Sequence, residues 1–419
     1  MTLCFLHLHG MCSPGDPHAP GRALPPRLSR LASAGATIEL LSPPPDQAAP
    51  RAVTLATGFL ADAHGILSDD EPRPDLLGAR PASSDGRHRP AIWEIAAAAG
   101  KSAVSVGWPA THPASPQPSM PGLRVVTSAF ASHNSRHREC WPMTSGCIQP
   151  ESLRPELAQL RVCAPQITAQ QLGGLIPALA EIDQDRDDVL QRLATALARC
   201  ATNHAAATLM AEQQPDLLCV HLALAAEVHR VCRELRPRSI RADGSSPLDD
   251  ATSNAAAFLD FVTGRYMNLC GHHSQYVIVL DPPPGCDAPG LCILHGPGIR
   301  PTRAQASTVD IVPTILSLLG LPLAADMDGR PIAPALDVVP RDVELWTHDT
   351  PRAAPTAIDP SVIRGIMDDL RSQGYQPPPR RAAADIDRVK STRLEAIRQI
   401  HAYSRTRRDH PAAGGTASR

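Results

Sequence analysis

Histidine and carboxylate side chains at the ends of apolar strands are the residues of this chain best suited to chemistry. His9 follows the apolar run Thr2–Leu8, and Asp281 follows the apolar run Tyr276–Leu280. Imidazole nitrogens and carboxylate oxygens are the usual protein ligands of zinc. A single histidine at a strand end is more often a hydrogen-bonded structural residue, and an aspartate before three prolines can simply start a turn. Residues of these types at strand ends can bind a metal ion, but each of the two also has a plain structural role.

Two histidine pairs also invite a metal interpretation, and neither of them predicts a site. His272 and His273 are adjacent, and adjacent side chains do not converge on one ion from a helix or a strand. His133 and His137 could lie one helical turn apart, but the serines around them do not favour a stable helix.

The composition describes a protein with a large core and no strong charge. Of its 419 residues, 43% are hydrophobic, which is enough for one large domain or two smaller ones. The net charge of −2 requires neither nucleic acid nor a membrane as a partner. The chain has no apparent signal peptide and no apolar stretch of about 20 residues, so we expect a cytoplasmic location. Its 11 scattered cysteines include no CxxC pair and predict buried, reduced thiols.

Apolar strands alternate with helical patterns along most of the chain, which predicts an α/β fold with a mostly parallel sheet. The expected strands are Thr2–Leu8, Ala36–Leu41, Ser102–Val106, Asp216–Leu222, Tyr276–Leu280 and Gly290–Leu294. The expected helices are Arg27–Ala34, Pro90–Ala99, Asp187–Met210, Asp249–Leu269, Thr308–Leu319 and one that starts at Val53. A change in composition divides the chain into a domain over 1–339 and a Pro- and Arg-rich helical extension over 340–419 with a disordered end.

Several segments, in their order along the chain, resemble the type I phosphodiesterase/nucleotide pyrophosphatase family of the alkaline phosphatase superfamily. They are Ala56-Thr57-Gly58 with His64-Gly65-Ile66, Pro90-Ala91-Ile92-Trp93, Val106-Gly107-Trp108, Gly296-Pro297-Gly298-Ile299, Asp310-Ile311-Val312-Pro313-Thr314, Asp326-Met327-Asp328-Gly329-Arg330 and Leu370-Arg371-Ser372-Gln373-Gly374-Tyr375. The resemblance implies an alkaline-phosphatase-like three-layer α/β/α sandwich. It also implies ester cleavage by two metal ions, commonly zinc, with a Thr or Ser nucleophile and three Asp and three His ligands.

Most of the positions that the resemblance assigns to this chemistry hold other residues here. The nucleophile position is Ala48, and Thr54 is a weak substitute inside the following helix. His9 stands where the resemblance implies the first Asp. Ala225 replaces the Asp of a D-x-x-x-H pair whose histidine, His229, is retained.

Two further positions lie near residue 281. Asp281 is retained, but Pro282 follows it where the resemblance implies a histidine ligand. Cys286 stands at the position of the last histidine. The resemblance therefore retains His229 and Asp281 as metal ligands, with His9 and Cys286 as substituted ones.

These substitutions predict a catalytically impaired member of the family, a pseudoenzyme that acts by binding or as a scaffold. No cofactor is expected, and zinc is the expected ion if a metal binds. The partner is unknown; a protein partner fits a scaffold role. The alternative is an active metal-dependent phosphoric or sulfuric ester hydrolase in which Thr54, His9, Asp281, His229 and Cys286 form a reorganised site. A decaying copy without function is a third interpretation, which the coherent Asp326–Arg330 segment disfavours.

Overall fold

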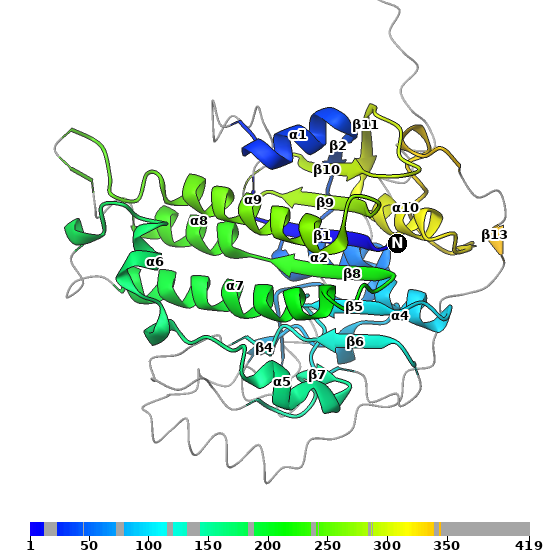
Figure 1. The fold of residues 1–419 in the computed structure, drawn as a ribbon, viewed down its shortest axis with the longest axis horizontal. Coiled ribbons are helices and arrows are strands. Elements are labelled where there is room, and N and C mark those ends of the chain that lie inside the picture. The colour runs from blue at the N-terminus through cyan, green and yellow to red at the C-terminus, as the bar shows by residue number, and fades with distance from the viewer. Residues whose placement is uncertain are drawn as a thin grey trace, which may run out of the picture.

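The computed structural model describes most of the chain up to residue 338 (Figure 1). The described residues are 1–11, 23–44, 46–72, 79–114, 120–131, 143–182, 188–235, 240–241, 243–283, 286, 288–338 and 343–344. The extension predicted over 340–419 lies outside them, apart from the short strand β13 (Val343–Glu344). The histidines His133 and His137 lie outside them as well.

A nine-stranded sheet forms the centre of the molecule, in the order β11-β2-β10-β9-β1-β8-β5-β6-β7. Its strands are β1 (Leu3–His9), β2 (Ala36–Leu41), β5 (Ala103–Val106), β6 (Leu123–Val126), β7 (Ile148–Gln149), β8 (Leu217–Leu222), β9 (Gln275–Asp281), β10 (Gly290–His295) and β11 (Arg303–Ser307). The central run from β9 through β1, β8 and β5 to β6 is parallel, whereas β10 and β7 pair antiparallel to their neighbours. The mostly parallel sheet predicted from the sequence is confirmed.

Helices cover both faces of this sheet, so the molecule is a three-layer α/β/α sandwich (Figure 1). One layer holds α1 (Pro26–Ala34), α7 (Val189–Ala211), α8 (Leu224–Leu235) and α9 (Ala251–Cys270). The other holds α2 (Ala48–Thr57), α4 (Ile92–Ala98) and α10 (Ile311–Leu318). Shorter elements are α3 (Ala61–His64), β3 (Asp70–Pro72), β4 (Ala79–Pro81), α5 (Arg154–Ala158), α6 (Ala169–Gly173) and β12 (Leu323–Ala324), which pairs with β13.

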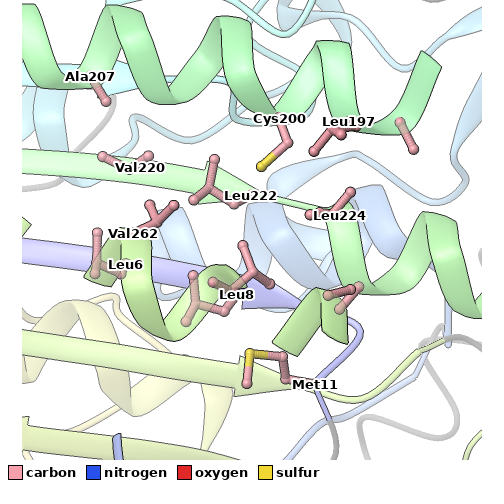
Figure 2. Packing of buried hydrophobic residues seen from close by; sticks show 14 of the residues in the cluster. Leu6, Leu8, Met11, Leu197, Cys200, Ala207, Val220, Leu222, Leu224 and Val262 are labelled. Atoms are coloured by element: carbon pink, nitrogen blue, oxygen red, sulfur yellow. The ribbon is translucent and has the colours of Figure 1, made fainter. Parts of the chain in front are cut away.

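Alternate residues of the central strands build two separate cores. Leu6 and Leu8 of β1 face the layer of α7, α8 and α9, together with Val220 and Leu222 of β8 (Figure 2). The residues that alternate with these face the opposite layer; among them, Phe5 is fully buried. Because side chains alternate along a strand, each buried strand supplies apolar groups to both cores.

Helix α2 begins earlier than the sequence predicts. It starts at Ala48 rather than at Val53 and ends at Thr57, and the next residue, Gly58, adopts the left-handed conformation with φ 74°. Pro50 is the third residue of the helix, where its missing N–H group would have no partner in any case. The proline therefore lies within the first turn and does not delay the helix.

The cysteines depart from the expectation at one position. Eight described cysteines are free, and all of them except Cys286 are buried. Cys163, however, is disulfide-bonded, so the prediction of reduced thiols is wrong there. None of the helices in the described part of the chain has the length and apolar character that a membrane crossing requires.

Candidate functional site

The register of three parallel strands brings histidine and aspartate side chains together at one end of the sheet. His7 of β1 lies beside His221 of β8, and His9 lies beside Asp281 of β9. All four residues face the α2 side of the sheet, because they alternate with the apolar residues that face α7 to α9. They also lie at the carboxyl ends of their strands, which is where sheets of this kind bind ligands.

Asp281 is the centre of this cluster and is almost completely buried, with 1% of its surface exposed. The Nδ1 atom of His9 donates to Oδ2 of Asp281 across 3.1 Å. The Nε2 atom of His7 lies 3.4 Å from the same oxygen. A hydrogen bond of 2.9 Å joins Nδ1 of His7 to Nδ1 of His221. Trp108 packs against both histidine rings, with centroid distances of 5.5 and 5.8 Å.

A positive side chain from α2 completes the cluster. The guanidinium of Arg51 donates from Nη2 to Oδ1 of Asp281 in a short contact. Its Nη1 donates to Asp46 across 2.9 Å and to the backbone carbonyl of Pro282 across 3.5 Å. Arg51 is only 4% exposed, so the guanidinium and the Asp281 carboxylate form a buried ion pair. We refer to His7, His9, Arg51, His221 and Asp281 as the strand-end cluster.

The charges of the strand-end cluster follow from burial and from this ion pair. Burial by itself would raise the pKa of Asp281, but Arg51 and the two neighbouring histidines outweigh it and hold that pKa well below its usual value. Burial lowers the pKa of His7 despite the nearby carboxylate. Burial and the neighbouring His7 lower the pKa of His221 well below its usual value. At neutral pH Asp281 is therefore ionised, and His7 and His221 are neutral.

The structure brings together two of the four residues predicted as metal ligands. His9 and Asp281 belong to a group with His7 whose ligand atoms all lie within 4.8 Å of one another. His229 lies half-buried on α8 and is not part of this group. Cys286 is half-buried and, together with Arg51, lines a cavity of about 330 Å³. The role of His229 and Cys286 as ligands stays a prediction.

The two predicted nucleophile positions lie on α2. Ala48 is the first residue of the helix, and the N–H group of its neighbour Ala49 donates to the carboxylate of Asp69 across 2.6 Å. Thr54 is buried one and a half turns further on, and its hydroxyl lies 3.0 Å from Nε2 of His64. His64 accepts a hydrogen bond at Nδ1 from the backbone of Ile66, so its Nε2 carries the hydrogen that Thr54 accepts. In that arrangement His64 cannot remove the hydroxyl proton of Thr54.

A cavity of about 310 Å³ adjoins the strand-end cluster, with His221 in its wall. It is also lined by Ala49, Asp69, Arg80, His112, Arg199, Asn203 and Glu227, among mostly apolar groups. The guanidinium of Arg199 donates to Glu227 across 2.7 Å. The other lining guanidinium, Arg80, donates to Glu71 across 2.8 Å. Both positive charges are thus paired within the protein.

Sequence reasoning did not identify His7, Arg51 or His221 as members of this site. A signal was present for the histidines, because His7 and His9 take alternate positions of β1 and His221 interrupts the apolar strand β8. Those positions share one face of the sheet. No comparable signal marked Arg51, because its partner Asp281 is 230 residues away.

Solved structures with a similar fold include several hydrolases. Human ectonucleotide pyrophosphatase/phosphodiesterase 5 is 11% identical and aligns with a TM-score of 0.46 over 81% of this chain and 100% of its own. BT1596, a 2-O GAG sulfatase, is 12% identical, with a TM-score of 0.46 over 80% of this chain and 73% of its own. The phosphonate monoester hydrolase of Agrobacterium radiobacter is 14% identical, with a TM-score of 0.42 over 82% of this chain and 79% of its own. These likenesses concern the fold alone.

In sequence, no curated protein matches this chain. The family model of the type I phosphodiesterases/nucleotide pyrophosphatases, in contrast, matches residues 18–230, about half of its length. The matched region contains the nucleophile position Ala48, the guanidinium of Arg51 and the strand that carries His221. Together with the α/β/α sandwich, this match shows that the chain belongs to the type I phosphodiesterase/nucleotide pyrophosphatase family.

Proposed function

We propose that this chain is a member of its family that does not hydrolyse esters and acts instead by binding a small molecule. The observation that carries the proposal is the guanidinium of Arg51 on the carboxylate of Asp281. Asp281 is a position at which the family resemblance implies a metal ligand, and here its negative charge is already balanced by a protein cation. With Ala48 at the nucleophile position, there is no attacking oxygen at that place, and the carboxylate of Asp281 is not free for an ion.

The residues at the amino end of α2 also disfavour the binding of a phosphate ester. The amino end of a helix favours an anion such as a phosphate group. In this chain the carboxylate of Asp69 takes the N–H group of Ala49, next to the nucleophile position. An approaching phosphoryl group would therefore meet a negative charge at that place.

The cavity beside the strand-end cluster is the binding site of the proposal. Its lining is mostly apolar, and its two guanidinium groups are paired with Glu71 and Glu227. Sites for small organic molecules have this character, with a few polar groups in an apolar wall. We expect the ligand to be a largely uncharged organic molecule rather than a phosphate dianion.

An ester hydrolysis assay tests the proposal. Bis(4-nitrophenyl) phosphate and 4-nitrophenyl sulfate are offered to the purified protein with zinc or manganese. We expect the rate to equal that of Asp281→Asn and of buffer alone, because no nucleophile and no ion act on the ester. Zinc-dependent turnover that disappears in Asp281→Asn or His229→Ala would show that the chain is an active hydrolase with a reorganised site.

A further inference from the structure

The strand-end cluster contains more ligand atoms than its ion pair uses. We propose that His7, His9 and Asp281 form a latent site for one zinc-like divalent ion, which the guanidinium of Arg51 closes by serving as a built-in cation. This inference rests on the proposed function, in which Arg51 balances the charge of Asp281. It goes further, because it assigns a metal site to a set of three side chains that includes His7.

The distances between the three side chains suit one ion. Two ligand atoms about 2.1 Å from a tetrahedral ion lie about 3.4 Å apart. Nδ1 of His9 and Oδ2 of Asp281 are 3.1 Å apart, and Nε2 of His7 is 3.4 Å from the same oxygen. For Nδ1 of His9 to coordinate an ion, the ring must carry its hydrogen on Nε2 instead of on Nδ1. Two imidazoles and one carboxylate are also a ligand set that zinc accepts, with a fourth position left for water.

His7 supplies an independent sign that the cluster can take a ligand. Its side chain is completely buried, and its Nε2 atom forms no hydrogen bond among the described residues, with only the 3.4 Å ion-pair contact to Oδ2 of Asp281 beside it. Its other ring nitrogen is oriented by the hydrogen bond with Nδ1 of His221. Metal-bound histidines characteristically have such a partner on their second nitrogen, because it fixes the tautomer and the ring orientation.

Arg51 explains why the site is closed in the protein as it stands. Its guanidinium occupies Oδ1 of Asp281 and is itself held by Asp46 and by the carbonyl of Pro282. A divalent ion on Oδ2 would lie close to this buried positive charge, where little water screens the repulsion. The seven positions that the family resemblance assigns to catalysis include neither His7 nor Arg51. The proposed site is therefore particular to this chain.

Replacing Arg51 by methionine opens the proposed site, because methionine keeps an aliphatic side chain and removes the charge. We expect Arg51→Met to bind about one zinc ion per chain in equilibrium dialysis and to give the visible absorption of four-coordinate cobalt. The unsubstituted protein should bind no zinc at the cluster. Adding His7→Ala to Arg51→Met should abolish the binding, since it removes one of three ligands.

Arg87→Met is the matched control. Arg87 is also 4% exposed and is paired with Glu94, but it lies outside the strand-end cluster. This variant loses a buried ion pair of the same kind and should gain no zinc. Zinc uptake by Arg87→Met equal to that of Arg51→Met would overturn the proposal, because the gain would then follow from loosened packing.

Three further results would also overturn it: a folded Arg51→Met that binds no zinc, an unsubstituted protein that binds zinc through His7 as tightly as the variant, and binding that survives His7→Ala.

If Arg51→Met does not fold without metal, recovery of its unfolding transition on addition of zinc supports the site. If it folds under neither condition, Arg51→His at pH 8 replaces it, and failure of that variant to bind zinc refutes the inference. Ester hydrolysis by the unsubstituted protein refutes the proposed function by a separate measurement.

Discussion

At the scale of single residues, the ion pair between Arg51 and Asp281 decides what the strand-end cluster can do. Both side chains are nearly inaccessible to water, and each compensates the desolvation of the other. A buried pair of this kind contributes little net stability compared with apolar residues, but removing one partner leaves the other charge unpaired. The pair is therefore better understood as a guanidinium that takes the place of a metal ion than as a source of stability.

Substitution of the two partners tests this coupling. Arg51→Met should lower the free energy of unfolding by about 3–5 kcal/mol, because the Asp281 carboxylate stays buried without its cation. Combining Arg51→Met with Asp281→Asn should recover a large part of that loss, since neither charge then remains. Urea denaturation of the two single variants and the double variant, without added metal, measures the coupling. Strictly additive losses would show that the two charges do not depend on each other.

At the scale of elements, the junction between β1 and α8 holds the end of the central strand close to a helix. Gly10 follows β1 with φ 92°, a conformation that other residues rarely adopt. A Cβ atom added there would lie 1.9 Å from the backbone nitrogen of Ala226 in the first turn of α8. The neighbouring Ala225 is the position at which the resemblance implies a metal-binding aspartate, so the junction holds that position next to the end of β1.

Gly10→Ala should therefore destabilise the protein by about 3 kcal/mol or more, because backbone atoms must move apart. Gly100→Ala is its control. Gly100 has a similar φ of 79°, but an added Cβ atom there meets no atom within 4 Å. It should lose only about 1–2 kcal/mol, the cost of the left-handed conformation for alanine. Equal losses in thermal unfolding would show that the close approach to α8 is unimportant.

The elements also show how far the sequence determines the site. The six predicted strands and the longer helices are confirmed with small shifts of their ends, because apolar runs and Gly or Pro residues at their ends are local signals. The short strands β6, β7 and β11 were not predicted, since they add only two to five residues at the sheet edges. The family resemblance identified His9 and Asp281, which both follow apolar runs. Arg51 was not, because an ion pair across 230 residues is a property of the tertiary structure.

At the scale of the whole molecule, two neutral histidines in the interior link stability to acidity. The folded protein keeps the pKa values of His7 and His221 lowered, whereas in the unfolded chain they return to about 6.5. Below that pH the unfolded chain therefore binds protons that the folded protein does not. Stability from these groups is present above about pH 6.5 and is lost as the pH falls. Asp281, with its lowered pKa, adds a second loss below about pH 4.

We expect the free energy of unfolding to decrease between pH 7 and pH 5 by up to about 1.4 kcal/mol per pH unit for each of the two histidines. His221→Gln should reduce this slope, because one of the two proton-binding groups is removed. His272→Gln, at an exposed position, should leave it unchanged. Urea denaturation at several pH values measures the slopes. Equal slopes for the unsubstituted protein and His221→Gln would contradict the assignment.

The place of β1 in the sheet has a consequence for the order in which the chain folds during synthesis. Its two neighbours are β8 and β9, so β1 leaves the ribosome before both of its partners, which follow it by more than 200 residues. His9 meets Asp281 across 272 residues of chain. Contacts of such high sequence separation form slowly and late. The nascent chain must therefore carry an unpaired, strongly apolar strand through most of its translation, and such a strand is a natural target for chaperones.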